Sequence, residues 1–226
     1  MSTPRDLSRR DFLRASAAST AAVAIPSGVF AFSSASIKIG LVGCGGRGTG
    51  AVIDAANASK DVELWAMADV FADHMQGSQN TLKDNLKERY KVTPERTFIG
   101  FDAYKQLLAS GVDVVILTTP PAFRPGHLKA AIEAGKHVFM EKPVAVDAPG
   151  IRSVFESSDL AKTKNLAIVA GTQRRHDVAY REAMKRIREG EMGDVVACYA
   201  YWNQGGLWMH PRKPEWSDLE WQLRNW

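Results

Sequence analysis

The sequence predicts an α/β protein with a doubly wound parallel sheet, followed by the start of a second domain. Short β-branched runs alternate with segments of helical periodicity from residue 37 onward, a pattern typical of parallel βαβ units. A glycine-rich run at residues 43–48 joins the first apolar run to a helical segment. An acidic residue, Asp69, ends the second apolar run. Together these three observations predict a Rossmann-type sheet.

The composition is that of a globular protein. The chain has 226 residues, of which 45% are hydrophobic and 24% charged, which excludes a disordered polymer, a collagen and a membrane bundle. The net charge is +4, and only +2 remains without residues 1–35, which hold four arginines and two aspartates. Because no basic face is clustered, we expect no nucleic-acid partner. Cys44 and Cys198 are the only cysteines; their number excludes a disulfide scaffold and their spacing indicates no metal site.

Each element of the sheet region has its own local signal. Apolar, largely β-branched runs predict strands at residues 37–42, 62–68, 97–99, 112–117, 137–140 and 166–170. Helical periodicity predicts helices at residues 50–56, 71–90, 122–134 and 147–164. A further helix is expected after Asp102, a good N-cap residue. Gly135 is expected to end the helix that precedes it.

Residues 1–35 resemble an export signal. Arg9 and Arg10 precede a Phe-Leu pair, and a weakly apolar run over residues 15–32 follows. This run is too short and too mild for a stable bilayer span, so we expect no membrane association after removal of the signal. The paired arginines match the twin-arginine motif, which predicts a periplasmic or otherwise exported protein. A disordered basic tail is the alternative.

The chain is expected to divide at two further boundaries. Residues 36–170 form the sheet domain, and residues 171–226 begin a second domain that is incomplete. In this second part a helix is expected at residues 177–189, an alternating strand at 194–201 and a loop-rich stretch at 202–226. Five of the six tryptophans lie in that last stretch, and such large aromatics normally pack against a partner surface. An ordinary hydrophobic C-terminal segment is the alternative.

The glycine run predicts a dinucleotide site. Gly43 permits a tight turn, Gly45 leaves no Cβ in the path of a pyrophosphate, and Gly48 allows the helix to pack closely on the strand. The N–H groups at the start of that helix suit a phosphate. Asp69 follows at the end of the second strand, where its carboxylate can accept both ribose hydroxyls. Since its charge would repel a 2′-phosphate and the next basic residue is Lys83, NAD is favoured over NADP.

Two further strands are expected to end at the same edge of the sheet as the glycine run. The fourth strand ends in Thr119 and Pro120, and the fifth ends in Glu141 and Lys142. Ligands of doubly wound sheets bind at this carboxyl edge. The Lys142 ammonium is placed to polarise a carbinol oxygen of a substrate. A solvated lysine paired with Glu141 is the alternative.

These residues resemble the Gfo/Idh/MocA oxidoreductases, named for glucose–fructose oxidoreductase and inositol dehydrogenase. The resemblance spans residues 37–226 and rests on the glycine run, Asp69, the Thr-Pro-Pro run at 119–121, His127, and the segments at 134–138 and 141–143. It implies a Rossmann domain with tightly held NAD(P), and a second α/β domain whose open antiparallel sheet carries a sugar or polyol site. It further implies that Lys142 is the catalytic lysine, and it allows a cis peptide bond between Lys142 and Pro143, as in several relatives.

The resemblance also implies the remaining site residues. Coenzyme contacts are expected from the glycine run, the strand ends and one later residue: Gly43, Gly45, Gly46, Arg47, Gly48, Asp69, Thr119, Pro120, His127, Glu141 and Gln173. Arg175 is expected near the substrate. A small sugar or polyol is the expected partner, and a homo-oligomer is left open.

Three functions follow from the resemblance. The first is an NAD(P)-dependent oxidoreductase that acts on a sugar or polyol by hydride transfer. The second is an NAD-dependent glycosidase that uses transient oxidation, similar to the α-N-acetylgalactosaminidase branch. The third is a nucleotide-binding fragment without turnover, because relatives are longer and supply an Asp and a His that complete catalysis, whereas no Asp-x-x-x-His follows Lys142 here.

Overall fold

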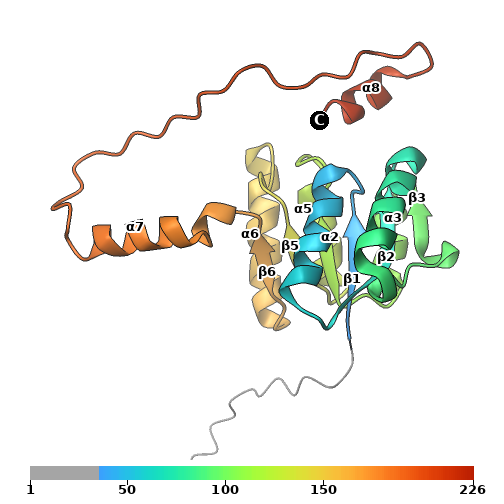
Figure 1. Ribbon diagram of the computed structural model, residues 1–226, viewed down its shortest axis with the longest axis horizontal. Helices are drawn as coiled ribbons and strands as arrows, with labels where there is room; N and C mark the ends of the chain where they lie inside the picture. Colours follow the sequence, from blue (N-terminus) through green and yellow to red (C-terminus); the bar gives the residue numbers. More distant parts are fainter. Residues whose placement is uncertain (1–35) are drawn as a thin grey trace, which may run out of the picture. The chain divides into compact units, whose positions relative to one another are not determined.

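The computed structural model describes residues 36–226, and its centre is a parallel sheet of six strands (Figure 1). The strand order is β3-β2-β1-β4-β5-β6, which is that of a doubly wound dinucleotide-binding sheet. The strands are β1 (Ile37–Val42), β2 (Val62–Asp69), β3 (Thr97–Ile99), β4 (Val114–Leu117), β5 (His137–Met140) and β6 (Ile168–Ala170). The predicted doubly wound parallel sheet is confirmed, whereas the described residues after β6 form no second sheet.

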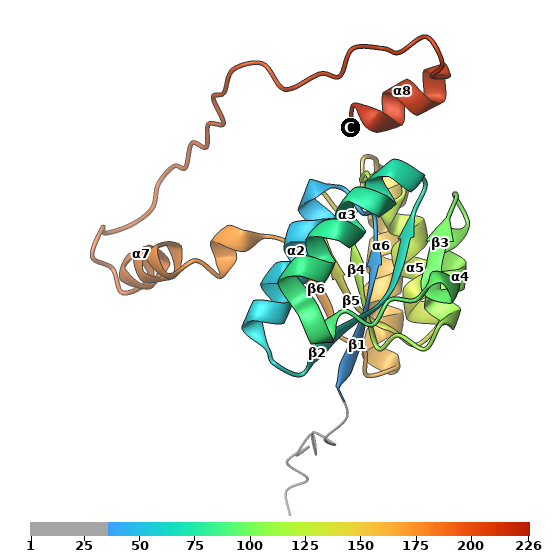
Figure 2. The same ribbon diagram turned by 45° about the vertical axis from the view of Figure 1, so that its right-hand side comes forward.

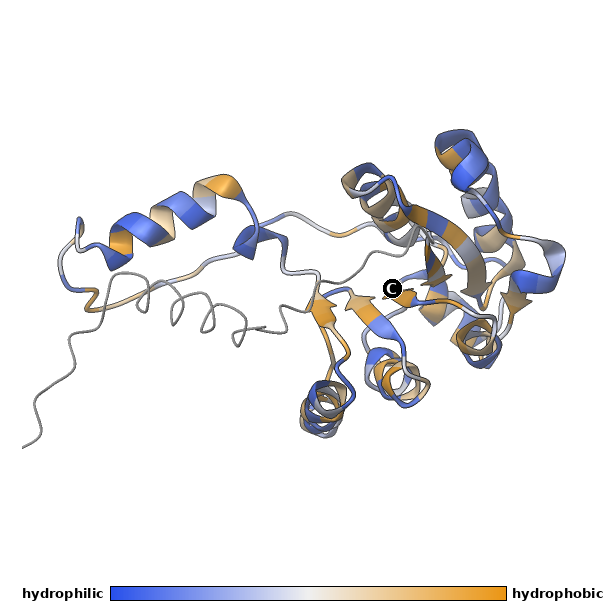
Figure 3. Ribbon diagram, turned by 90° about the horizontal axis from the view of Figure 1, so that it is seen from below, coloured by the Kyte–Doolittle hydropathy of each residue, from blue (hydrophilic) through white to orange (hydrophobic). Residues whose placement is uncertain are grey.

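Helices cover both faces of the sheet, as the rotated view shows (Figure 2). On one face lie α2 (Gly46–Ala58) and α3 (Ala72–Leu86). On the other lie α4 (Ala103–Ala109), α5 (Arg124–Glu133) and α6 (Ala148–Thr163). Each face has its own hydrophobic core, so the central strands are buried on both sides and are largely apolar, as the orange parts of the strands in Figure 3 show.

Alternate residues of one strand serve the two cores. Leu41 of β1 belongs to the same core as Val52 of α2 and Leu82 of α3, whereas Val42 belongs to the core of Leu107 of α4 and Leu128 of α5. This alternation is the two-residue period of a strand. Because β1 and β4 run parallel, their carboxyl ends lie at the same edge of the sheet, next to the loops that carry the candidate site.

Several predicted element boundaries differ from the observed ones. The first helix begins at Gly46 rather than at residue 50, because the glycine run itself forms its first turn, with the Thr49 N–H donating to the Gly45 carbonyl at 3.0 Å. Helix α3 ends at Leu86, where Lys87 adopts a φ of 50°, and a short 3-10 helix η1 (Lys87–Arg89) follows. Asp102 precedes α4 as expected, but its side chain bonds Lys105 at 2.7 Å rather than capping the helix.

The segment after β6 differs most from the prediction. It contains η3 (Gln173–Arg175), α7 (Val178–Arg188) and α8 (Asp218–Arg224). The strand predicted at residues 194–201 is wrong: among the described residues this segment pairs with no strand. A strand needs a neighbour for its N–H and C=O groups, and here the side chains stand exposed, Val196 by 94%.

Helix α8 was missed by the sequence reading, although the sequence contains its start signal. Ser217 is the N-cap, and its hydroxyl accepts the Glu220 N–H at 3.1 Å. Ser-x-x-Glu is the capping-box spacing. Between residues 36 and 226, no helix combines the length and the apolar character that a membrane crossing requires.

Candidate functional site

The loop between β1 and α2 has the geometry of a phosphate cradle. Gly43 has a φ of 97°, which favours glycine, and a Cβ there would lie 2.8 Å from the Thr119 nitrogen. A Cβ at Gly48 would lie 2.0 Å from the Gly43 carbonyl oxygen, so only glycine lets α2 approach β1 this closely. At Gly45 and Gly46, by contrast, a Cβ would meet no described atom within 4 Å. The loop is therefore closely packed on the side of the sheet, and it leaves free space on the side of Gly45 and Gly46.

The N-terminus of α2 faces this open side. Its N-cap is Gly45, and no side chain of residues 36–226 caps the helix. The first N–H groups of a helix lack intrahelical partners and carry the positive end of the helix dipole. A diphosphate fits this arrangement, because it accepts such N–H groups and carries negative charge.

Asp69 is anchored at the carboxyl end of β2. Its Oδ2 accepts the N–H of Cys44 at 2.5 Å, and its Oδ1 accepts the N–H of Phe71 at 2.8 Å. The residue is only 9% exposed. The carboxylate thus ties the glycine loop to the loop after β2, and each oxygen keeps a lone-pair position for a further donor such as a ribose hydroxyl.

One cavity of about 1740 Å³ runs along this edge of the sheet. It is bordered by the loop after β1, the ends of β2, β4 and β5, and the segment after β6. The predicted residues that line it are Gly43, Gly45, Gly46, Arg47, Gly48, Asp69, Thr119, Pro120, His127, Glu141, Lys142 and Gln173. Arg175 is exposed and lies outside the cavity wall. Its substrate contact stays a prediction.

Glu141 and Lys142 have separate environments. Glu141 is 6% exposed, and its Oε1 accepts Arg47 Nε at 2.7 Å. Its Oε2 accepts the backbone N–H of Lys142 at 3.1 Å. The Lys142 ammonium has no ion pair with Glu141, the alternative that the sequence left open, and its side chain is exposed at the cavity. The Lys142–Pro143 peptide bond is cis.

His127 and Thr119 meet on the α5 side of the cavity. The Thr119 hydroxyl lies 3.1 Å from His127 Nδ1, and the Tyr104 ring lies 4.2 Å from the imidazole. Burial among these groups lowers the pKa of His127 from 6.5 to about 4. The imidazole is therefore neutral at neutral pH and serves as an uncharged wall of the cavity.

Arg124 was not singled out from the sequence. It is 4% exposed, and one guanidinium nitrogen donates to the carbonyl oxygen of Pro143, directly after Lys142. Its Nε is buried without a hydrogen-bond partner among the described residues. Burial lowers the pKa of this guanidinium, while the charge of Glu141 raises it. Arginine in a surface helix is common, so no sequence signal distinguishes this one.

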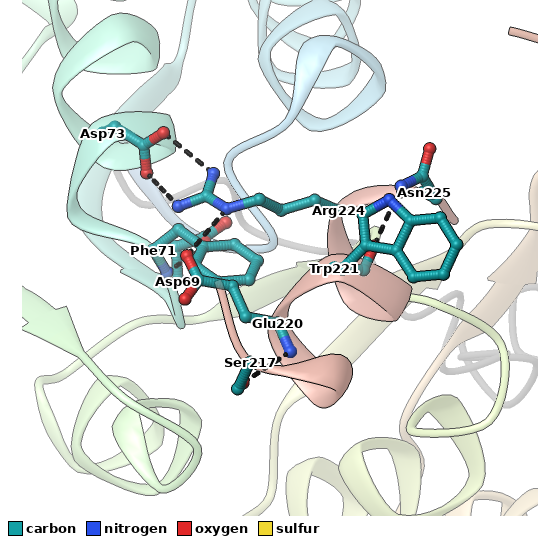
Figure 4. A network of polar contacts seen from close by, with 8 residues as sticks. All are labelled: Asp69, Phe71, Asp73, Ser217, Glu220, Trp221, Arg224 and Asn225. Atoms are coloured by element: carbon teal, nitrogen blue, oxygen red, sulfur yellow. Dashed lines mark hydrogen bonds and ion pairs between the residues drawn. The ribbon is translucent and has the colours of Figure 1, made fainter. Parts of the chain in front are cut away.

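Helix α8 also borders the cavity, through Leu223, Arg224 and Trp226. Arg224 forms an ion pair with Asp73 of α3 at 2.9 Å (Figure 4). The two residues are 151 positions apart in the sequence, so no local pattern connects them. Among residues 36–226 there is no cluster of three side chains suited to a metal ion, and Cys44 and Cys198 are free thiols.

Comparison with known proteins agrees with this geometry. Residues 37–172 match the Gfo/Idh/MocA family, described as an oxidoreductase family with an NAD-binding Rossmann fold. The inositol 2-dehydrogenase of Salmonella typhimurium is 29% identical over 164 residues, which cover 72% of this chain and 45% of that protein. Residues 6–26, which lie outside the described residues, match the twin-arginine translocation signal. The chain is thus directed to twin-arginine export.

Two solved structures have the same fold. The scyllo-inositol dehydrogenase of Lactobacillus casei, with bound NAD(H) and scyllo-inositol, is 28% identical with a TM-score of 0.54, covering 70% of this chain and 43% of its own. A 3-ketoreductase of Actinomadura kijaniata in complex with NADP is 24% identical with a TM-score of 0.53, covering 69% and 43%. The chain spans less than half the length of these proteins.

The family match extends over most of the described sheet domain and ends at residue 172. It includes the glycine loop, Asp69 and the Glu-Lys-Pro segment, which the fold brings to one cavity. The chain belongs to the Gfo/Idh/MocA oxidoreductases with an NAD-binding Rossmann fold.

Proposed function

We propose that the chain provides the coenzyme-binding half of an exported, NAD-dependent oxidoreductase that acts on a sugar or polyol by hydride transfer. One observation supports this most directly: the open glycine loop, Asp69 and the exposed Lys142 line the same cavity. An inositol 2-dehydrogenase and a scyllo-inositol dehydrogenase among the relatives favour a polyol substrate.

NAD is the preferred coenzyme in this proposal. A buried carboxylate, Asp69, at the end of β2 disfavours the 2′-phosphate of NADP by charge repulsion. The guanidinium of Arg224, which lies 4.0 Å from the Phe71 ring centre, is engaged by two carboxylates, Asp73 at 2.9 Å and Glu220 at 2.9 Å. Its charge is therefore largely compensated, and it offers little attraction to an additional phosphate.

In this proposal some residues of the chain bind the coenzyme and another orients the substrate. The N–H groups at the start of α2 hold the diphosphate, and Asp69 accepts the ribose hydroxyls. When bound, NAD supplies a hydride acceptor at its nicotinamide ring. Lys142 donates a hydrogen bond to the substrate carbinol oxygen, which orients the substrate and stabilises negative charge on that oxygen.

Tight retention of NAD fits the export route. Twin-arginine transport carries folded proteins, so a coenzyme acquired before transport can leave with the protein. Outside the cytoplasm the supply of soluble coenzyme is poor, and a coenzyme that is held and recycled avoids this limit. The expected consequence is that NAD copurifies with the exported protein.

A specific experiment tests the coenzyme assignment. The full chain is titrated calorimetrically with NAD and NADP, alongside Asp69→Asn. The variant keeps an acceptor oxygen for the Cys44 or Phe71 N–H but loses the charge. We expect NAD affinity to fall roughly tenfold, about 1.4 kcal/mol, with little change for NADP. Equal losses for both coenzymes would refute the ribose role of Asp69.

A second candidate function is coenzyme binding without turnover. Of the residues expected to act on the substrate, the described cavity is lined by Lys142, and residues 143–226 contain no Asp-x-x-x-His. Formation of NADH with inositols and simple sugars is measured on the full chain. NAD binding without turnover supports this candidate, whereas turnover supports the oxidoreductase. Release of sugar from a glycoside without net NADH would instead indicate the glycosidase outcome.

A further inference from the structure

Helix α8 is attached to the first turn of α3 by a two-point ion pair. Arg224 Nη1 lies 2.9 Å from Asp73 Oδ2, and Nη2 lies 3.2 Å from Asp73 Oδ1. Figure 4 shows the guanidinium facing the carboxylate in this paired arrangement. Two parallel bonds fix the direction of the arginine as well as its distance, and such pairs are stronger than single contacts between exposed charges.

The same guanidinium is enclosed by further groups. It lies 4.0 Å from the Phe71 ring centre and 4.8 Å from that of Trp216. Its Nε donates to Glu220 at 2.9 Å, one turn earlier in α8. The Arg224 side chain is only 13% exposed, whereas that of Asp73 is 63% exposed, so the ion pair is shielded from water on the arginine side. The hydrogen bond from Arg224 is the main reason that the pKa of Asp73 lies below its usual value.

These contacts lead directly to Asp69. The Phe71 N–H donates to Asp69 Oδ1 at 2.8 Å, and the Phe71 ring lies against the Arg224 guanidinium. Leu223, Arg224 and Trp226 line the same cavity as Asp69 and the glycine loop. The C-terminal turn of α8 is therefore a wall of the cavity beside the residue assigned to the ribose.

The sheet order decides which half of a dinucleotide this wall can reach. Strands β1 and β4 lie between β2 and β5, so the ends of β2 and β5 are three strand spacings, about 14 Å, apart. Asp69 and α8 lie at the β2 end, and Lys142 lies at the β5 end. A wall at β2 contacts the adenosine half, far from the reacting ring.

We propose that α8 is part of the adenosine subsite: Arg224 anchors the helix to Asp73 and Phe71, and Leu223 and Trp226 cover the bound adenosine. This inference rests on the proposed dinucleotide site. The ligand is the ADP-ribose portion of the coenzyme, which contacts Leu223 and Trp226 where they line the cavity. Because binding and docking of α8 share these contacts, each strengthens the other by the same factor.

The experiment measures ADP-ribose and NAD binding to the full chain by calorimetry. Arg224→Ala is expected to weaken both about tenfold, within the usual range of coupling between sites. Arg188→Ala is the matched control, because it removes the same side chain from α7, whose residues do not line the cavity. The control is expected to bind like the unmodified chain. Inorganic pyrophosphate, which has no adenosine, is expected to bind both variants and the unmodified chain alike.

A second measurement does not depend on a variant. Amide hydrogen exchange of residues 217–226 is followed in the unmodified chain with and without ADP-ribose. We expect slower exchange with ADP-ribose and no change with pyrophosphate, since only the adenosine contacts α8. A double-mutant cycle of Arg224→Ala with Asp73→Asn is expected to be non-additive, because either change alone undocks the helix.

The outcomes separate this inference from the proposed function. If the unmodified chain binds NAD but Arg224→Ala binds ADP-ribose equally well, α8 is not part of the adenosine subsite and the inference fails alone. Unchanged exchange of residues 217–226 on ADP-ribose binding has the same meaning. If the unmodified chain binds neither NAD nor ADP-ribose, the proposed dinucleotide site itself is wrong.

Discussion

At the scale of single residues, the site depends on which glycines face the protein and which face the cavity. Gly48 has the Gly43 carbonyl within 2.0 Å of a prospective Cβ, whereas Gly45 faces open space with a φ of −70° that any residue adopts. Glycine is therefore required at these two positions for two unrelated reasons. One is packing of α2 on β1, and the other is room for a ligand.

This difference predicts opposite effects of two matched substitutions. Gly48→Ala is expected to destabilise the fold by about 3 kcal/mol or more, because a backbone carbonyl rather than a flexible side chain must move. Gly45→Ala is expected to leave the melting temperature almost unchanged but to weaken NAD binding at least tenfold. Thermal unfolding and calorimetric titration of both variants check this. A stable Gly48→Ala variant would contradict the packing argument.

His127 predicts a dependence of stability on pH. Its pKa is about 4 in the folded protein and near 6.5 when unfolded, so the unfolded chain takes up a proton first as pH falls. Above about pH 6.5 both states are neutral and this residue contributes no pH dependence. Between pH 6.5 and 4 it destabilises the fold progressively, by about 1–3 kcal/mol.

Urea unfolding at pH 7 and pH 5 measures this effect. His127→Gln, which does not titrate, should have a smaller loss of stability over the same interval than the unmodified protein. Identical pH profiles for the two proteins would mean that burial of His127 is not the cause.

At the scale of elements, the start of α5 holds the segment that carries Lys142. Arg124, at the first position of α5, donates to the Pro143 carbonyl and fixes the loop between β5 and α6. Removal of the guanidinium would take away the hydrogen-bond donor of the Pro143 carbonyl. A buried arginine therefore connects two elements that meet only in the folded chain.

Arg124→Met tests this connection. Methionine fills part of the space but cannot bond the Pro143 carbonyl, so we expect a loss of about 1–3 kcal/mol in the free energy of unfolding. Arg152→Met, on the exposed part of α6, is the control and should change stability by less than about 0.5 kcal/mol. Chemical denaturation measures both. Equal stabilities would show that the Pro143 carbonyl finds another donor.

At the scale of the whole molecule, the chain combines a transport signal with a coenzyme fold. The signal match covers residues 6–26 and the family match covers residues 37–172. The two matches do not overlap, so the signal can be changed without touching any residue that lines the cavity. Export and coenzyme binding are therefore separable properties.

Substitution of both signal arginines tests the export route. Arg9→Lys with Arg10→Lys keeps the charge but removes the residues of the twin-arginine motif. We expect the protein to accumulate in the cytoplasm, still able to bind NAD, as measured by cell fractionation. The control pair, Arg5→Lys with Arg14→Lys, should be exported normally. Export of the first variant would exclude the twin-arginine route.

Some residues of the candidate site could be predicted from the sequence, and others could not. The glycine loop and Asp69 were predictable because each lies at the end of a strand with a strong local pattern, and in a parallel sheet all such ends meet at one edge. Arg124 and Arg224 were not, since both act through contacts distant in the sequence, with Pro143 and with Asp73. Ser217 and Glu220 do form a capping-box signal for the start of α8, although the aromatic residues around them favoured the prediction of a loop.

Local patterns in the amino-acid sequence were enough to predict the doubly wound sheet, the order of its elements and the position of the glycine loop. These depend on local periodicity and on backbone conformations that only certain residues adopt. Contacts made after folding determine that Glu141 pairs with Arg47 rather than with the Lys142 ammonium, that residues 194–201 form no strand, and that α8 borders the cavity. Each of these depends on which partner is within reach after folding, and a strand or an ion pair exists only when its partner is there.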